Sequence, residues 1–389
     1  MRGGWTRPTL ISIANIQQGK TLAKIDMTGG DHDVFGANGV IGRYTSGHYT
    51  FDVIGVGCRG TCGSVHIARA GSFLANNVMG VWPKDVESVS LGYLTLALEN
   101  TDFRGEGIVS GQVQPQITRE SLAGLKISCP SLAEQQRIVD LIGSLDEAIE
   151  AADVSSEMTR LGMDTVADSL IFAGARWPET KVRDVAEKRG LIGGPFGSSL
   201  VSTDYVEHGV PVIRGKNMPT SEAFVDGPFV FVSDEKADSL HRNQAVPGDV
   251  IFTQRGTLGQ VGLVPADGPS QYVISQSQMR LRVSEVALSE FVFYAFRSPR
   301  MVAHMKGLNS ATANPHINLG TLAEVAFPLP PIEEQIRIVE ILGAAMTAAT
   351  ESEESATSLR HLRTNLLTAL LSGTHEIPES YDDLLSEAV

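Results

Sequence analysis

Apolar side chains recur at alternating spacings of four and three residues in two long stretches of the chain. This is the 3.5-residue period of a coiled-coil seam, and it predicts two long helices that each present one apolar edge to a partner helix. The first seam consists of Ile138, Ile142, Leu145, Ile149, Ala152, Ser156, Thr159, Met163, Val166 and Leu170. The second consists of Ile338, Leu342, Ala345, Ala349, Ser352, Ala356, Leu359, Arg363, Leu366 and Leu370.

Helix-ending residues bracket both stretches. Pro130 and Pro330 stand just before the predicted starts, while Ala173-Gly174 and Ser372-Gly373 follow the predicted ends. About 40 helical residues, each rising about 1.5 Å, would make a rod of roughly 60 Å. Each helix is therefore long enough to act as a spacer.

Two helices with matching seams most simply pack against each other, antiparallel, with one globular region at each end. The small and polar seam residues Ser156, Thr159, Ser352 and Arg363 weaken the packing in the middle and can set its register. The alternative is a pair of ordinary amphipathic helices, each packed only on its own domain.

The remainder of the chain has short apolar runs separated by glycine. Segments such as TFDVIGVGC and GDVIFTQRG are rich in β-branched residues and typical of strands joined by turns. The predicted fold class is α+β, with two strand-rich domains separated by two long antiparallel helices that form a coiled coil. The expected boundaries are 1–130 and 176–330 for the strand-rich domains, 131–175 and 331–373 for the helices, and 374–389 for an acidic tail.

The chain contains an internal repeat. PSLAEQQRIVDLIG from Pro130 matches PPIEEQIRIVEILG from Pro330 at an offset of 200, and the match continues upstream through Ile117 and Ile317. RGTCGSV from Arg59 matches RGTLGQV from Arg255. The chain is therefore two copies of one unit related by a pseudo-twofold repeat, and the second copy carries an insertion before its RGTLG.

The composition of the chain agrees with two globular domains. With 389 residues and 42% hydrophobic content the chain can form two or more domains with cores of their own. It has no apolar run long enough for a bilayer and no secretory leader, so we expect a cytoplasmic protein that does not contact membranes. Its three cysteines support neither a disulfide framework nor a metal site.

Charge is distributed unevenly. The net charge of -14 at first argues against DNA, since phosphate binding needs clustered lysine and arginine. The acid is confined to two short segments: residues 129–180 hold 3 basic and 10 acidic side chains, and residues 323–389 hold 3 and 12. The two strand-rich regions are close to neutral.

The order of these motifs resembles the specificity subunits of type I restriction-modification systems. The resemblance rests on GPFGSSL, GVPVIRGKN, GDVIFTQRGTLG and the entry PLPPIEEQIRI into a long helix, and the repeat carries it over nearly the whole chain. It implies two target-recognition domains that each read one half of a split site in double-stranded DNA. It also implies modification (methyltransferase) subunits, expected in two copies, that dock on the helices, and restriction subunits that join them.

This resemblance implies a non-catalytic DNA-specificity subunit with no cofactor. The first copy has no counterpart of GPFGSSLVSTDY in its sequence, so we expect two recognition domains of different subtypes and an asymmetric target. A scaffold that assembles proteins through its coiled coil without binding DNA is the alternative function.

Two glycine-flanked arginines are the leading candidates for DNA contact. A tight turn lets the backbone approach a phosphate and projects the guanidinium toward phosphate or guanine; the same turn could also be structural, with its arginine paired to a carboxylate. The turns comprise Arg59, Gly60 and Thr61 in the first copy and Arg255, Gly256 and Thr257 in the second. Further candidates are Arg43, Tyr44, Asn76, Asn77, Arg214, Lys216, Asn217, Gln276, Ser277 and Gln278. Each could instead be a solvated surface or turn residue.

The seam residues are candidates either for helix packing or for binding a partner. These are Ile138, Ile142, Leu145, Ile149, Ile338, Leu342, Leu359, Leu366 and Leu370.

Enzyme motifs are weak. AxxxxGKT at Ala14 to Thr21 resembles a phosphate loop but lacks the first glycine that such a loop requires. Histidines at HExxH spacing, a GxSxG elbow and an Asn/Asp-Pro-Pro-aromatic methyltransferase tetrad do not occur. The sequence therefore supplies no catalytic or metal-binding residues, and a residual enzyme using the GKT segment is the third hypothesis.

Overall fold

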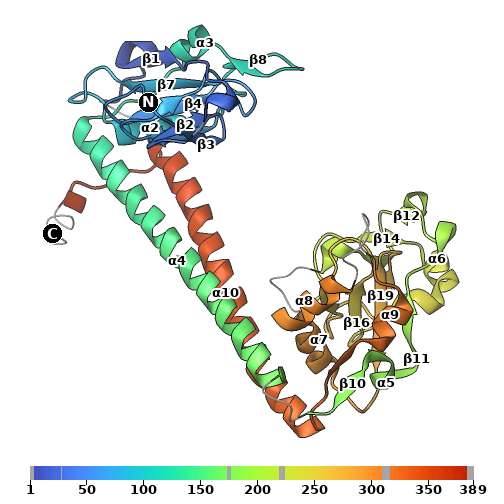
Figure 1. The fold of residues 1–389 in the computed structure, drawn as a ribbon. Helices are drawn as coiled ribbons and strands as arrows, with labels where there is room; N and C mark the ends of the chain where they lie inside the picture. The colour runs from blue at the N-terminus through green and yellow to red at the C-terminus, as the bar shows by residue number, and fades with distance from the viewer. Residues whose placement is uncertain (1–3, 28, 173–176, 219–223, 309–315, 383–389) are drawn as a thin grey trace. The chain divides into compact units, whose positions relative to one another are not determined.

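The computed structural model describes residues 4–27, 29–172, 177–218, 224–308 and 316–382. The chain divides into two compact units. The first unit contains residues 1–150 and 357–389, and the second contains residues 151–356. Each unit combines one strand-rich domain with parts of the two long helices (Figure 1).

The first unit opens with a short helix and alternates short strands with turns. Its elements up to the first long helix are α1 (Leu10–Ile13), β1 (Ala14–Gln18), η1 (Lys24–Asp26), β2 (His32–Gly36), β3 (Gly39–Tyr44), β4 (Val53–Gly57), β5 (Val65–Ala68), β6 (Phe73–Leu74), β7 (Val78–Pro83), α2 (Leu91–Glu99), β8 (Val109–Ser110), β9 (Gln116–Ile117) and α3 (Arg119–Gly124).

The second unit follows the same order with additions. Its elements are β10 (Glu179–Lys181), α5 (Val182–Val185), β11 (Ala186–Gly193), η2 (Gly197–Ser199), η3 (Ser202–Asp204), β12 (Tyr205–Val206), β13 (Val210–Ile213), η4 (Gly215–Asn217), β14 (Val230–Val232), α6 (Asp234–Ser239), η5 (His241–Asn243), β15 (Gln244–Ala245), β16 (Val250–Thr253), β17 (Val261–Leu263), β18 (Tyr272–Ile274), β19 (Gln278–Val283), α7 (Ser289–Arg297), α8 (Pro299–Gly307), α9 (Leu319–Glu324) and β20 (Ala326–Pro328).

The two units share one sheet topology. The first has a four-stranded sheet in the order β1-β7-β4-β5, and the second has β11-β19-β16-β17. A second sheet in each unit contains a parallel pair, in which Val34 faces Phe73 in the first unit and Val212 faces Val273 in the second. The second sheet has three strands in the first unit and five in the second, because β12 and β15 are added. These strands account for part of the predicted insertion.

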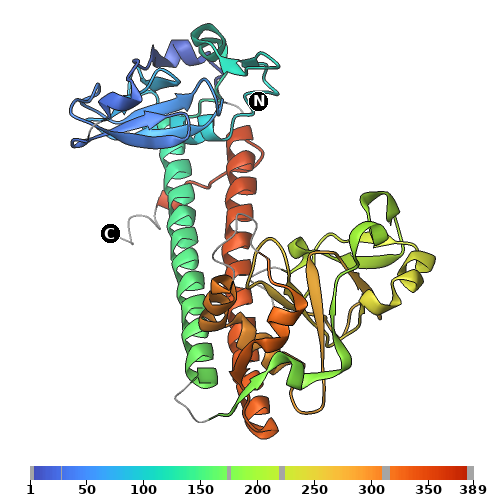
Figure 2. The ribbon, with the colours of Figure 1, turned by 45° about the vertical axis from the view of Figure 1, so that its right-hand side comes forward.

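The long helices are α4 (Leu132–Phe172) and α10 (Ile332–Ser372), each of 41 residues. They run side by side in both views (Figures 1 and 2). In the first unit the start of α4 and the end of α10 belong to one core, which includes Ile142 and Leu370. In the second unit Ala167 and Leu342 likewise share a core. The antiparallel pairing and the α+β fold class are therefore confirmed, and the alternative of two independent helices is wrong.

One part of the predicted seam is wrong. Val166 is 38% exposed, whereas Met163, Ala167 and Ile171 are buried. The buried positions are four residues apart here, closer to the 3.6-residue period of a straight helix than to a strict heptad. Leu367 and Leu371 are buried in the same way near the end of α10. Near the end of each helix the buried face therefore includes residues next to the predicted seam, namely Ala167, Leu367 and Leu371, while Met163 and Leu370 stay buried as predicted.

Among the helices of the described residues, none combines the length and the apolar character needed to span a bilayer. The predicted end of the first helix at Ala173-Gly174 lies outside the described residues. At the end of α10, Gly373 has a φ of +73°, a left-handed conformation that favours glycine after a helix.

Candidate functional site

The RGT turn of the first unit follows strand β4. Gly60 and Gly63 have φ angles of +80° and +87°, which side-chain-bearing residues rarely adopt. The backbone N–H of Cys58 donates to the carbonyl of Asn77 at 2.8 Å, so the start of the turn is fixed to a neighbouring loop. Arg59 is exposed at the tip.

The RGT turn of the second unit is built the same way after strand β16. Gly256 and Gly259 have φ angles of +100° and +85°. The backbone N–H of Gln254 donates to the carbonyl of Ser277 at 2.7 Å, in the place of the Cys58–Asn77 bond. The motif R-G-T-x-G therefore recurs because both of its glycines occupy left-handed positions of the same turn.

The two tip arginines are open to solvent. Arg59 and Arg255 are both exposed, and neither guanidinium forms an ion pair with any of the described residues. The predicted alternative, an arginine paired to a local carboxylate, therefore has no support within the described residues. A guanidinium held on a rigid turn in this way can accept a phosphate or the edge of a guanine.

Four loops of the second unit meet around Arg255. They comprise residues 194–200, 214–217, 254–259 and 275–278. Backbone bonds tie them together: Ser275 N donates to Ile213 O at 2.9 Å, and Gly194 N donates to Gln278 O at 2.8 Å. The side-chain amide of Gln276 donates to the carbonyl of Leu200 at 2.7 Å. The candidates of the second unit thus lie on one connected surface.

Two of these candidates do not face outward. Asn217 is fully buried; its amide oxygen accepts from Arg214 N at 3.1 Å and its amide nitrogen donates to Asp226 O at 3.2 Å. Gln278 is also fully buried, and its amide oxygen accepts from Ser275 Oγ. Both were predicted as DNA contacts, and the structure corrects this because their amides stabilise loops from inside. Arg214 is half-buried.

Among the predicted contacts on this surface, Lys216, Gln276 and Thr257 are exposed like Arg255, and Ser277 is half-buried. Gln276 uses its amide nitrogen on Gly197 O and Leu200 O, which leaves its carbonyl oxygen as the group it can offer to a ligand.

In the first unit the equivalent surface carries Asn76, which is exposed, and Asn77, which is half-buried. The amide nitrogen of Asn76 lies 3.4 Å from Thr21 Oγ1. The other two candidates sit on strand β3. Arg43 pairs with Asp33 at 3.1 Å, and the Tyr44 ring packs edge-on against Phe73 with 5.5 Å between centroids.

The GKT segment proves to be part of this surface and not a nucleotide site. Ala14 begins strand β1, and Gly19 follows it with its backbone N–H donating to Val78 O at 2.9 Å. A Cβ on Gly19 would lie 2.1 Å from the carbonyl oxygen of Ala75, so a side chain has no room there. A short 3-10 helix (Lys24–Asp26) follows in place of the α-helix that a phosphate loop requires.

Gly194 is the counterpart of Gly19. Its N–H donates to Gln278 O, and a Cβ there would lie 2.1 Å from Ser275 O, 200 residues after Ala75. The prediction that the first copy has no counterpart of GPFGSSLVSTDY is therefore wrong at the first residue of that segment, Gly194. The equivalence of Gly19 and Gly194 is not visible in the sequence, because the two copies share only the glycine and the residues after it differ.

One exposed residue was missed by sequence reasoning. Asn38 lies in the turn between β2 and β3. Strand β2 pairs in parallel with β6, as β13 pairs in parallel with β18 in the second unit. The turn after β2 is therefore the counterpart of the segment after β13, which contains Lys216. Asn38 and Lys216 are both exposed. The Gly-Ala-Asn-Gly sequence at residues 36–39 was the available signal, because such residues favour a hairpin turn.

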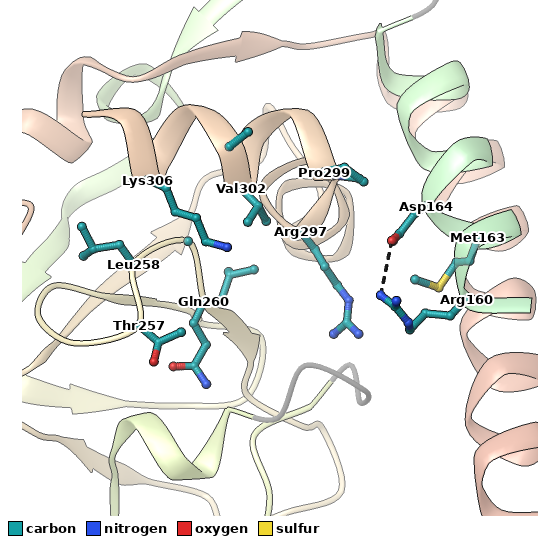
Figure 3. A pocket seen from close by; sticks show the side chains of 13 residues that line it. Arg160, Met163, Asp164, Thr257, Leu258, Gln260, Arg297, Pro299, Val302 and Lys306 are labelled. Atoms are coloured by element: carbon teal, nitrogen blue, oxygen red, sulfur yellow. Dashed lines mark ion pairs between the residues drawn. The ribbon is translucent and has the colours of Figure 1, made fainter. Parts of the chain in front are cut away.

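A pocket of about 420 Å³ lies beside the RGT turn of the second unit, between that turn, helix α8 and helix α4 (Figure 3). Its lining includes Leu258, Gln260, Arg297 and Lys306. Arg160 on α4 is held by Asp164 at 3.7 Å. Burial lowers the pKa of the Arg297 guanidinium, although Asp164 acts in the opposite direction. The pocket therefore brings the cationic side chains of Arg160, Arg297 and Lys306 close to the RGT turn of the second unit.

The seam candidates serve helix packing. Ile138, Ile142, Ile338, Leu342 and Leu370 are buried in the cores of their units. Leu145, Ile149, Leu359 and Leu366 are half-buried. The five buried residues are not available to a partner, which corrects the partner-binding option for them.

A different apolar stripe is exposed on α4. Val154, Met158 and Leu161 are 56%, 65% and 47% exposed, and their spacing of four and three residues puts them on one face of the helix. The residues 200 positions later in α10 are Glu354, Ser358 and His361, so the repeat does not reproduce this stripe.

Comparisons with known proteins agree with this architecture. The family model described as "Type I restriction modification DNA specificity domain" matches residues 3–158 and again residues 176–357. The type I restriction enzyme MjaIX specificity subunit of Methanocaldococcus jannaschii is 25% identical over 173 residues, which are 43% of this chain and 37% of that protein. The MjaVIII specificity subunit of the same organism is 19% identical over 301 residues, 72% of this chain and 69% of that protein.

A solved structure shares the fold. The crystal structure of the type I restriction-modification S subunit from M. genitalium superposes with a TM-score of 0.58 at 18% identity, covering 96% of this chain and 97% of that one.

Proposed function

Because the chain belongs to the family of type I restriction modification DNA specificity domains, we propose that it is the DNA-recognition subunit of a type I restriction-modification complex. It reads a bipartite target in double-stranded DNA, with one half-site for each unit. Methyl transfer and DNA cleavage are carried out by its partner subunits. We place the recognition domains at residues 1–130 and 176–330, and the spacer helices are α4 (Leu132–Phe172) and α10 (Ile332–Ser372).

The observation that carries this proposal is the duplicated arginine turn. Arg59 and Arg255 stand on turns with the same two left-handed glycines and the same backbone bond to a neighbouring loop. Exposed amide and hydroxyl side chains surround each turn, including Asn76 in the first unit and Gln276 in the second. Arginine positions a protein on phosphate or guanine, and amide side chains read base edges.

The surroundings of the two turns differ. The second sheet has three strands in the first unit and five in the second. Asn38 takes the place of Lys216, and Lys20 follows Gly19 where Pro195 follows Gly194. Surfaces with different donors and acceptors read different bases, so the two half-sites are unlike and the target is asymmetric.

The helices supply the surface for the methyltransferase subunit. Their acidic composition disfavours phosphate and suits a protein partner. The stripe of Val154, Met158 and Leu161 offers exposed apolar area among these charges, and a partner would bury it. The restriction subunits join this assembly.

The test is to measure DNA binding by the chain with and without its methyltransferase subunit at matched salt. We expect weak binding by the chain alone, since its net charge of -14 repels phosphate, and tight binding by the complex. Methylation mapping should then reveal an asymmetric two-part motif. Equal affinity in both states, or a palindromic motif, would count against the proposal. A scaffold without DNA function would show no dependence on Arg59 or Arg255.

A further inference from the structure

A short β-hairpin extends from the first unit. Strands β8 and β9 pair through Val109 with Ile117 and Ser110 with Gln116, and the hairpin points away from the rest of the domain (Figure 1). Gly111 makes the turn, with a φ of +85°. A Cβ there would lie 2.5 Å from the carbonyl oxygen of Gln114. The turn therefore requires glycine at this position.

The hairpin is fixed to the arginine turn. Arg59 and Gln116 form an isolated antiparallel bridge, and Ile117 N donates to Cys58 O at 3.0 Å. The thiol of Cys62 donates to Pro115 O at 3.1 Å, and burial raises the pKa of this thiol, which keeps it protonated as a donor. The arginine turn and the base of the hairpin thus form one connected structure.

The tip of the hairpin has an unusual surface for a protein in water. Val113 is 94% exposed, and Gln112 and Gln114 on either side are exposed as well. Residues 107–118, GIVSGQVQPQIT, contain no charged side chain. An exposed β-branched residue contributes nothing to the core, and an uncharged tip meets no repulsion from phosphate. This chemistry suits a site where apolar and amide groups meet a ligand.

We propose that this hairpin enters the major groove of DNA beside Arg59 and reads A·T base pairs. The inference rests on the proposed function and adds the residues that read one half-site. A two-stranded ribbon fits the major groove, glutamine amides pair with N6 and N7 of adenine, and an apolar side chain contacts the methyl group of thymine. Gln112, Val113 and Gln114 supply these groups, while Arg59 supplies a contact to phosphate or guanine.

The second copy differs here. The residues 200 positions after the tip are Thr312, Ala313 and Asn314, which have neither the two glutamines nor the valine. Reading by the hairpin therefore belongs to the first unit alone, and it changes only one of the two half-sites.

The experiment uses the full chain assembled with its methyltransferase subunit. Gln112→Ala, Val113→Ala and Gln114→Ala are made singly and together, and the motif methylated by each complex is mapped. Each single change should lower discrimination at one base pair by roughly 5- to 100-fold, the range for a lost base contact. The triple change should relax two or more adjacent A·T positions of one half-site and leave the other half-site intact.

Val86→Ala is the matched control, because Val86 is also exposed (63%) and belongs to the first unit but not to the hairpin. It should leave the motif unchanged. Gly111→Ala should reproduce the triple change by deforming the turn, and it should also lower the thermal unfolding temperature because its backbone is left-handed, whereas the triple variant keeps Gly111 and should unfold like the unaltered chain. If the unaltered complex methylates a two-part motif and the triple variant methylates the same motif with the same stringency, the hairpin inference is overturned and the proposed function stands. If the unaltered complex shows no sequence preference, the proposed function fails as well.

Discussion

Gln135 and Gln335 make the same hydrogen bonds in the two units. Gln135 Oε1 accepts from the backbone N–H of Ser90 at 2.9 Å, and Gln335 Oε1 accepts from that of Leu288 at 2.8 Å. Each Nε2 donates to the carbonyl of the proline five residues earlier, at 3.1 and 2.8 Å. Both side chains are fully buried. Each glutamine therefore fixes the start of a long helix to the segment that precedes α2 or α7.

Replacing Gln135 by alanine should destabilise the first unit by about 3 kcal/mol, because it leaves buried backbone groups without partners at about 1–3 kcal/mol each. Denaturant unfolding of the full chain measures this loss. Gln136→Ala is the control, since Gln136 is exposed and its side chain bonds to Asp140 on its own helix, and the change should cost less than about 0.5 kcal/mol. Equal effects of the two changes would show that Gln135 does not hold the helix to the domain.

Arg363 joins the two helices in the first unit. It donates to both carboxylate oxygens of Asp146, one of them at 3.0 Å, and lies 3.5 Å from Glu99. The repeat has Met163 at the equivalent position. Arg363→Met should destabilise the chain by up to about 1 kcal/mol at pH 8, because Asp146 and Glu99 then both lose the guanidinium that pairs with them.

This effect should depend on pH. Burial raises the pKa of Glu99, and Arg363 lowers it. A carboxyl group whose pKa is higher in the folded state than in the unfolded state lowers the stability of the fold as the pH rises and the group ionises. Removing Arg363 raises the folded-state pKa of Glu99 further, so this loss of stability becomes larger. The Arg363→Met loss should therefore be smaller at pH 5 than at pH 8, and Glu99→Gln in the same chain should remove most of the difference. A loss independent of pH would contradict this role for Arg363.

The segment after α10 is held to the start of α4. Arg137 makes two hydrogen bonds of 2.7 Å to Asp382, and Ile377 of the same segment is buried in the core of the first unit. The Arg137 guanidinium lowers the pKa of Asp382, so the bond is present above the ordinary pKa of 3.8 and is lost as pH falls through the lower folded value.

Asp382→Asn should weaken this attachment at neutral pH and increase proteolytic cleavage after Ser372 severalfold. Ser380→Ala, a neighbouring exposed residue, should leave cleavage unchanged. Identical cleavage of both variants and the unaltered chain would mean that Arg137 does not hold the segment.

The exposed stripe on α4 should affect partner binding without affecting stability. Met158→Ser together with Val154→Ser should weaken binding of the methyltransferase subunit by roughly 10-fold or more, since buried apolar side chains are each worth about 1.5–3 kcal/mol. Ser358→Ala, at the repeat position of Met158, should not. Calorimetric titration provides the measurement, and unchanged affinity would place the docking surface elsewhere.

Much of the fold could be predicted because the long helices carry a 3.5-residue pattern and the repeat doubles every signal. The antiparallel pairing followed from two matching seams, and the RGT turns followed from glycines that need left-handed angles. The equivalence of Gly19 and Gly194 could not be predicted, because only backbone bonds to Val78 and Gln278 reveal it. The burial of Asn217 could not be predicted either, because an amide side chain can bond to a ligand at the surface or to backbone groups inside a loop.

Mapping the methylated motif for Arg59→Ala and Arg255→Ala, each in the full complex, tests most directly the claim that each unit reads its own half-site. We expect Arg59→Ala to weaken recognition of one half-site by roughly 10- to 100-fold and Arg255→Ala to weaken recognition of the other to a similar extent. The account is contradicted if both changes affect the same half-site, or if neither change alters the motif or the affinity.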